Sequence, residues 1–169
     1  GDLDFLACAE HPQALAKVFT TMPEVSKVLA SGETKCSVRL DINNIHIQAD
    51  LRLVPKESFG AALMYFTGSK EHNVRLRERA LRRKLTLNEY GLFPLDDDST
   101  PPQQRGVKAV ASRTEESIYK ALELPWIPPE VREDRTLEEI ATHEGVHALI
   151  QLDDIKSELH AHTTASDGR

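Results

Sequence analysis

The sequence lacks long apolar runs, a basic start and a cysteine framework. No stretch approaches the ~18 consecutive apolar residues of a membrane-spanning helix, so we expect no membrane partner. The first residues are acidic and do not resemble the basic start of a signal peptide. The two cysteines, Cys8 and Cys36, have neither metal-site nor disulfide spacing. A reducing, cytoplasmic compartment is therefore expected.

The chain also lacks an initiator methionine and a net positive charge. Its 169 residues suffice for one domain or two small ones. Because a strand pattern begins at once without a methionine, we expect a segment of a longer protein. The net charge of −6 argues weakly against a nucleic-acid partner, although a total does not show where the charges lie.

The hydrophobic periodicity predicts an α+β fold. Strands are expected at 2–7, on both sides of a turn within 25–41, at 45–54 and within 85–93, and helices at 11–21, 56–66, 70–84, 114–124 and, more weakly, 136–144. The strand 45–54 alternates most clearly. Its apolar face comprises Ile45, Ile47, Ala49, Leu51 and Leu53, and its polar face comprises His46, Gln48, Asp50 and Arg52.

The segment 70–84 is predicted to be a basic helix. It holds seven Lys or Arg residues and two Glu residues, an excess of five positive charges. Its inward face is expected to carry Val74, Leu76 or Arg77, Ala80 and Leu81. The charges are typical of a solvated helix face, but they could also bind nucleic-acid phosphates, with Arg75 and Arg79 among the contacts.

Three aspartates lie on strands that could be neighbours. Asp2 and Asp4 are two residues apart, so in a strand both side chains project from one face. If the strand carrying Asp50 pairs with theirs, the three carboxylates converge and could hold two divalent ions, the arrangement used for phosphoryl transfer. Such oxygen ligands suit Mg²⁺. The alternative is three aspartates on a solvated sheet surface.

Five short segments, in this order, resemble the palm and thumb of a family X DNA polymerase, the DNA polymerase beta group. They are GDLDFL (1–6), SGETK (31–35), ADLRLVP (49–55), YFTGS (65–69) and LNEYGLF (87–93), and the resemblance continues loosely through 116–134. It implies a nucleotidyltransferase palm with a mixed or antiparallel sheet over 1–56. A helical thumb with a small hairpin would follow over 57–134.

The segment ELHAHTTASDG (158–168) resembles the first motif of the PHP domain. In that domain the His-x-His pair supplies the first ligands of a multinuclear metal site. This implies that His160 and His162 are metal ligands, with Zn²⁺ or Mn²⁺ in the complete domain. A linker over 135–155 and the start of a PHP domain over 156–169 are expected, an order typical of bacterial and archaeal family X enzymes.

The family X resemblance also implies roles for single residues. Asp2, Asp4 and Asp50 match the catalytic aspartates, which hold two Mg²⁺ or Mn²⁺ ions; Asp50 would hold the catalytic ion and promote loss of the primer 3′-hydroxyl proton. The nucleotide site would comprise Tyr65, Phe66 and Gly68 along the sugar, Asn73 at the minor-groove side of the new base pair, and Arg52, which moves on closure. DNA contacts would come from Lys35 at the backbone and Arg77 near the template base.

The implied activity is templated addition of deoxynucleotides to a primer in DNA repair. The enzyme would be a nucleoid-associated monomer that acts on primer-template or gapped DNA with deoxynucleoside triphosphates. The sequence departs from the family in two ways: the Gly-Ser-x-x-x-Arg-Gly triphosphate motif is absent, and Lys70 stands where the beta enzyme has an acidic residue. A template-independent nucleotidyltransferase and a non-catalytic DNA-binding module are the alternatives.

Overall fold

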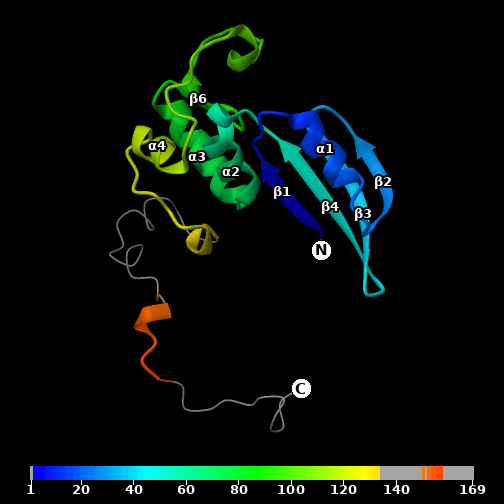
Figure 1. The fold of residues 1–169 in the computed structure, drawn as a ribbon. Coiled ribbons are helices and arrows are strands. Elements are labelled where there is room, and N and C mark those ends of the chain that lie inside the picture. The colour runs from blue at the N-terminus through cyan, green and yellow to red at the C-terminus, as the bar shows by residue number, and fades with distance from the viewer. Residues whose placement is uncertain (1, 134–149, 151, 158–169) are drawn as a thin grey trace.

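A four-stranded sheet with one helix precedes a helical unit with a small hairpin (Figure 1). The computed structural model describes residues 2–133, 150 and 152–157. The sheet unit comprises β1 (Leu3–Ala7), α1 (Pro12–Thr20), β2 (Val25–Ser31), β3 (Lys35–Ile42) and β4 (Ile45–Leu53). The helical unit comprises α2 (Phe59–Thr67), α3 (Lys70–Arg82), β5 (Leu85–Asn88), β6 (Gly91–Pro94) and α4 (Glu115–Ala121). Short 3₁₀ turns occur at Lys56–Ser58, Pro102–Arg105, Pro129–Val131 and Leu152–Asp154.

The sheet is mixed, and its strand order brings the first strand beside the fourth. The order is β1-β4-β3-β2, with β1 parallel to β4 and the other pairs antiparallel. A two-residue turn joins β3 to β4 at Asn43 and Asn44, whose φ angles are 52° and 64°. Asparagine tolerates this left-handed backbone, which matches the twist of a tight hairpin. The predicted α+β fold with a mixed sheet is confirmed.

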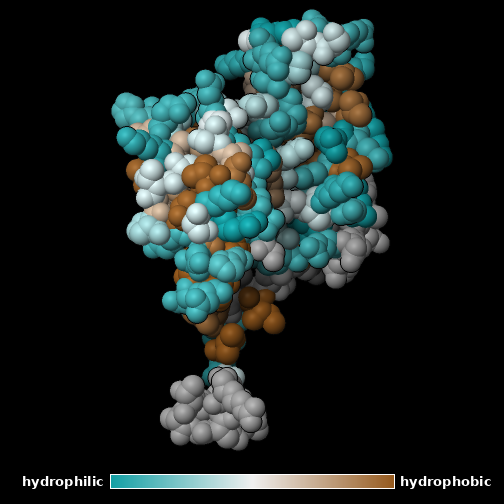
Figure 2. All heavy atoms as spheres, turned by 90° about the vertical axis from the view of Figure 1, so that its right-hand side faces the viewer, coloured by the Kyte–Doolittle hydropathy of each residue, from teal (hydrophilic) through white to brown (hydrophobic). Residues whose placement is uncertain are grey.

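The core of the sheet unit lies between the sheet and α1, which covers one sheet face (Figure 1). Its buried residues are Ala16, Phe19, Cys36, Val38, Leu40, Ala49, Leu51 and Leu53. The predicted alternation in β4 is therefore confirmed for its second half. It is wrong for Ile45, which is 65% exposed because the hairpin end of β4 extends past α1. Figure 2 views the molecule from the side of β2, where apolar side chains lie among polar ones. Val28 and Leu29 of β2 are exposed.

The helical unit has a separate core formed by α2, α3, α4 and the β5–β6 hairpin. Its buried residues are Ala61, Met64, Leu76, Ala80, Leu87, Leu92, Ile118, Tyr119, Leu122, Leu124 and Ile127. The start of α2 packs directly on the backbone before α4: the Gly60 amide donates to Arg113 O at 3.1 Å, and the Ala61 amide donates to Ser112 O at 2.9 Å. None of the described helices is long and apolar enough to cross a bilayer.

The inward face of α3 differs from the predicted one. Leu76 and Ala80 are buried as expected, but Val74 is 36% and Leu81 52% exposed. His72 lies on the buried side instead, where its Nε2 and the Tyr119 hydroxyl share a hydrogen bond of 2.7 Å, while its Nδ1 is buried without a partner among the described residues. The buried stripe is thus spaced by four residues and includes a histidine, which apolarity alone does not reveal.

Several predicted features lie outside the described residues. They are the weak helix over 136–144, most of the linker over 135–155, and the PHP-like motif with His160 and His162.

Candidate active site on the polar face of the sheet

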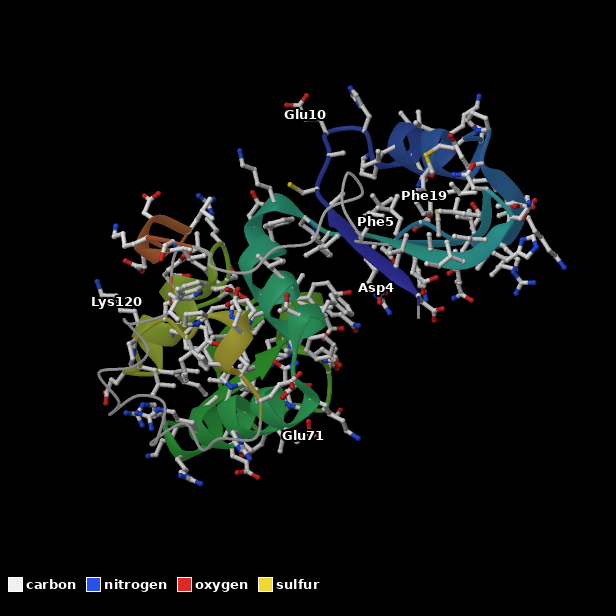
Figure 3. All side chains as sticks on the ribbon, turned by 90° about the horizontal axis from the view of Figure 1, so that it is seen from below. Asp4, Phe5, Glu10, Phe19, Glu71 and Lys120 are labelled. Atoms are coloured by element: carbon white, nitrogen blue, oxygen red, sulfur yellow. The ribbon has the colours of Figure 1, made fainter. Side chains whose placement is uncertain are left out.

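The parallel pairing of β1 with β4 places Asp4 directly beside Asp50. Their Cα atoms are register partners, so both side chains project from the same face of the sheet. The neighbour of Asp4, Phe5, projects from the other face, where its ring meets Phe19 of α1 edge-on with centroids 6.3 Å apart. Figure 3 shows Asp4 on the side of β1 away from that aromatic pair. The apolar contact behind the strand therefore orients the carboxylate in front of it.

Asp50 is a buried carboxylate with one partner on the neighbouring strand, Lys35, and one on its own strand, Gln48. It is 9% exposed. The Lys35 ammonium lies 2.5 Å from Oδ2, and the Gln48 amide donates to Oδ1 at 3.1 Å. The Lys35 contact lowers the pKa of Asp50 below its ordinary value, against the opposing effect of burial, with smaller contributions from Ser37 and Gln48. Asp50 is therefore ionised at neutral pH and already binds a cation.

The carboxylate oxygens of Asp4 and Asp50 are donors that suit a hard divalent ion, but the carboxylate of Asp2 does not join them. Asp2 precedes β1 and is exposed. Within residues 2–133, 150 and 152–157, no three Asp, Glu, His or Cys side chains form a group that could hold a metal ion. Asp4 and Asp50 supply two neighbouring carboxylates, one of them holding the Lys35 ammonium as a stand-in cation. The convergence of Asp2 with this pair stays a prediction.

Two hollows share the Phe66 side chain: one lies beside Asp4 where β1 and β4 meet α2, and the other lies between the end of α2 and the start of α3. The first, of about 320 Å³, is lined by Asp4, Phe5, Leu6, Arg52, Leu63, Phe66 and Thr67. The Arg52 guanidinium stacks over the Phe66 ring with Cζ 4.3 Å from the centroid. The second, of about 380 Å³, is lined by Tyr65, Phe66, Thr67, Gly68, Ser69, Lys70, Asn73 and Arg77. Phe66 belongs to both, so the structure brings the predicted nucleotide-site residues together around one aromatic side chain.

The second hollow is shaped by the turn between α2 and α3. Gly68 ends α2 with φ 80°, a backbone conformation that favours glycine. Ser69 caps α3 by accepting from the His72 amide at 3.2 Å, and its hydroxyl donates to Arg132 O at 3.1 Å. The side-chain amide of Asn73 donates from Nδ2 to Tyr65 O at 2.7 Å, and this hydrogen bond connects α3 to the end of α2.

Known proteins share both the sequence and the arrangement. The DNA polymerase beta thumb family matches residues 62–133. The DNA polymerase/3′-5′ exonuclease PolX of Bacillus subtilis is 36% identical over 167 residues, which are 99% of this chain and 27% of that protein. This chain belongs to the family X DNA polymerases.

Eukaryotic relatives match smaller shares of the chain. DNA polymerase lambda of Rattus norvegicus is 32% identical over 93 residues, 52% of this chain and 16% of that protein. The structure of Leishmania infantum polymerase beta in a ternary P/T complex has a TM-score of 0.61 and 27% identity, and the match covers 79% of this chain and 62% of that one. The chain spans about a quarter, 27%, of the length of the Bacillus relative.

The basic residues of this family X chain are only partly directed to the second hollow. Arg77 lines that hollow. Arg79 instead donates from Nε to Leu122 O at 2.7 Å and from Nη2 to Glu123 O at 3.2 Å, at the end of α4. Arg75 lies near His72 and lowers the pKa of that imidazole. The DNA-binding roles of Lys35, Arg75, Arg77 and Arg79 stay predictions.

Sequence reasoning missed two contacts of Asp50, one with Gln48 and one with Lys35. The Gln48 contact follows from the alternation of β4, which puts residues 48 and 50 on one face. The Lys35 contact follows from the hairpin register, in which Ser37 faces Asp50 and Lys35 faces Arg52. The signal was present at Asn43 and Asn44: a two-residue turn there fixes which residues of β3 and β4 face each other.

Proposed function

We propose that this chain forms the palm and thumb of a DNA-directed DNA polymerase. The enzyme adds deoxynucleotides to a primer 3′-hydroxyl by two-metal nucleotidyl transfer, in DNA repair. The supporting observation is the parallel register that sets Asp4 beside Asp50, with Asp4 lining a hollow that shares Phe66 with a second hollow formed by Tyr65, Gly68 and Asn73.

In this proposal the carboxylates hold the ions of the reaction. Asp2, Asp4 and Asp50 bind two Mg²⁺ or Mn²⁺ ions, which neutralise phosphate charge and activate the attacking oxygen when bound. Asp50 suits the role because it is buried and ionised, and because Gln48 fixes one oxygen while the other faces a cation. Its negative charge also favours loss of the primer 3′-hydroxyl proton.

The residues of the second hollow position the incoming nucleotide. Tyr65, Phe66 and Gly68 lie along its sugar. The Nδ2 atom of Asn73 is committed to Tyr65 O, so the Oδ1 atom would meet the minor-groove edge of the new base pair. Arg77 lies near the template base, and Arg52, stacked on Phe66, moves on closure. Such residues act by holding the reactants in line rather than by chemistry of their own.

The partners follow from the same proposal. They are primer-template or gapped DNA and deoxynucleoside triphosphates. The DNA partner is supported by the likeness to Leishmania polymerase beta, whose structure is that of a ternary P/T complex. We place the enzyme in the cytoplasm, at the nucleoid, as a monomer. His160 and His162 would begin a PHP domain that binds Zn²⁺ or Mn²⁺.

The test is an Asp50→Asn exchange in the natural protein that contains this chain. Primer extension should fall by more than about a hundredfold. Loss of a group that only hydrogen-bonds to a metal ligand already lowers metal affinity or activity by about 10–100-fold, and Asp50 is proposed as a ligand itself. Primer-template affinity, measured by fluorescence anisotropy, should change little because DNA contacts lie elsewhere. Asp41→Asn, an exposed aspartate of β3, is the matched control and should leave extension unchanged.

The outcome also separates the alternatives. Extension that persists in Asp50→Asn contradicts the proposal. Addition by the wild type that does not follow the template sequence would indicate a template-independent nucleotidyltransferase. DNA binding by the wild type without any metal-dependent addition would indicate a binding module.

A further inference from the structure

Lys35 is the one basic side chain that the structure pairs with a proposed catalytic carboxylate among the described residues. It is the first residue of β3, and in the hairpin register it faces Arg52 while Ser37 faces Asp50. Residues two apart on a strand share a face, so Lys35 reaches diagonally across to Asp50. The resulting contact joins Nζ to Oδ2 at 2.5 Å, with the Lys35 side chain 39% exposed and that of Asp50 12% exposed.

The contact uses the oxygen that a metal ion would need. Oδ1 of Asp50 already accepts from the neutral amide of Gln48, which can stay in place when an ion binds. Oδ2 carries the ammonium. A divalent ion bound to a carboxylate oxygen at ~2.0–2.1 Å would lie within a few ångströms of that ammonium. Two cations at that separation repel each other strongly in a partly buried site.

The Lys35 side chain can move away from the contact, whereas the buried carboxylate of Asp50 cannot. Lys35 has a flexible four-carbon stem and an accessible end, so its ammonium can move away from the sheet without moving the backbone. Asp50 is buried between the neighbouring strands β1 and β3. Binding of an ion therefore displaces Lys35, and the displaced charge remains on the face of the sheet that carries the carboxylates.

We propose that Lys35 is a tethered cation that occupies Asp50 until a divalent ion replaces it. This inference rests on the proposed function, because it takes Asp50 as a metal ligand. The lysine keeps the buried carboxylate paired while no metal is bound, and it lowers the metal affinity of the DNA-free protein. Metal binding then releases a positive charge that can contact a DNA phosphate.

The experiment measures binding of Mn²⁺ to the chain without DNA, from the electron paramagnetic resonance signal of the free ion. Lys35→Met keeps most of the stem and removes the charge, so Mn²⁺ affinity should rise by about tenfold, within the usual range of coupling between two sites. Lys35→Arg keeps the charge and should leave the affinity low. Lys27→Met, which removes an exposed lysine of β2 in the same sheet, is the matched control and should change affinity little.

A second variant separates failure of this inference from failure of the proposed function. In an Asp50→Asn background, Lys35→Met should no longer raise Mn²⁺ affinity, because the competition acts through Asp50. If Asp50→Asn alone leaves Mn²⁺ binding unchanged, the metal role in the proposed function is wrong. If Asp50→Asn weakens binding but Lys35→Met leaves it unchanged or also weakens it, Lys35 does not compete with the metal and only this inference is overturned.

Discussion

Arg132 is a fully buried arginine that joins the end of the described thumb to its helices. Its guanidinium makes two hydrogen bonds with Glu115, at 3.0 and 2.9 Å, and donates from Nε to Ile127 O at 2.9 Å. Trp126 Nε1 donates to the same carboxylate at 2.8 Å. The Arg132 carbonyl accepts from Ser69, the cap of α3. The buried ion pair of Arg132 with Glu115 thus also supports the turn between α2 and α3, beside the second hollow.

Removing one partner of this pair should be costly. Arg132→Met leaves the buried Glu115 without its cation, and we expect a loss of about 3–5 kcal/mol in the free energy of unfolding. Urea denaturation measures this loss. Arg82→Met is the control: its pair with Glu78 spans 3.9 Å between exposed side chains, so the loss should stay below about 1 kcal/mol. Equal losses in the two variants would show that the buried pair has no special role.

His72 should make the stability of the chain depend on pH. Burial, followed by the charges of Arg132 and Arg75, lowers the pKa of His72 from its ordinary 6.5 to about 4. The folded state therefore favours the neutral ring: its stabilising effect is complete above pH 6.5, declines as the pH falls through the window from 6.5 to 4, and is lost below it.

We expect the unfolding free energy to fall by roughly 2 kcal/mol between pH 7 and pH 5, where one protonation changes stability by at most about 1.4 kcal/mol per pH unit. His72→Phe fills the same space without a titratable group. Its stability should be lower at pH 7, because the Tyr119 hydroxyl loses its partner, but the slope should be absent. Denaturant melts at both pH values test this, and an unchanged slope in His72→Phe would assign the effect to another group.

At the scale of elements, α2 and the segment before α4 approach so closely that only glycine fits between them. A Cβ atom built on Gly60 would lie 2.3–2.4 Å from backbone atoms of Thr114, which cannot move aside as a side chain could. Two backbone hydrogen bonds fix this contact. The position of the first thumb helix therefore depends on the absence of a side chain.

Gly60→Ala should lower the unfolding free energy by about 3 kcal/mol or more, because overpacking here must shift backbone. Gly106→Ala provides the comparison. A Cβ at Gly106 meets nothing within 4 Å, but its φ of +73° costs an alanine about 1–2 kcal/mol. The two variants thus separate lack of space from backbone strain. Thermal or urea melts that rank Gly106→Ala as the more damaging would contradict the close contact at Gly60.

The sequence predicted those elements whose pattern depends on one strand or one turn. The alternation around Asp50 assigned Leu51 to the core and Asp50 to the polar face, and both assignments are confirmed. Patterns that depend on a distant partner were not predictable. The burial of His72 depends on its hydrogen bond with Tyr119, 47 residues away. The sequence does not show this hydrogen bond, so Val74 and Leu81 were the better candidates for the buried face of α3. The contacts of Arg79 with the Leu122 and Glu123 carbonyls, just after α4, were likewise not predictable from the sequence.

For the molecule as a whole, net charge and DNA binding need not agree. The chain carries −6, yet 70–84 concentrates an excess of five positive charges. We expect the chain to bind primer-template DNA with an affinity that falls by at least about tenfold between 50 and 200 mM salt. Fluorescence anisotropy at the two salt concentrations measures this fall. A salt-independent affinity would show that phosphate contacts do not carry the binding.

The same chain should extend a primer poorly. Its sequence does not include the Gly-Ser-x-x-x-Arg-Gly segment that the family uses for the triphosphate, and the proposed reaction depends on holding that group in line. A primer-extension assay with Mg²⁺ or Mn²⁺, run beside the natural protein that contains the chain, decides this point. Extension at the same rate would show that the Gly-Ser-x-x-x-Arg-Gly segment is not needed for the reaction.

The contact between Phe5 and Phe19 has a consequence for how the strand finds its place during folding. Side chains alternate along a strand, so a slip of β1 by one residue against β4 would turn Asp4 toward α1 and Phe5 toward the polar face. Such a slip would turn a charge toward the apolar core and break the contact of Phe5 with Phe19, which makes the misaligned pairing unfavourable. The backbone bond from Val54 N to Ala7 O, 3.0 Å long, closes the end of the pair in the native alignment. The apolar contact behind β1 thus helps to specify the register of β1 against β4, and the register keeps the Asp4 carboxylate on the polar face of the sheet.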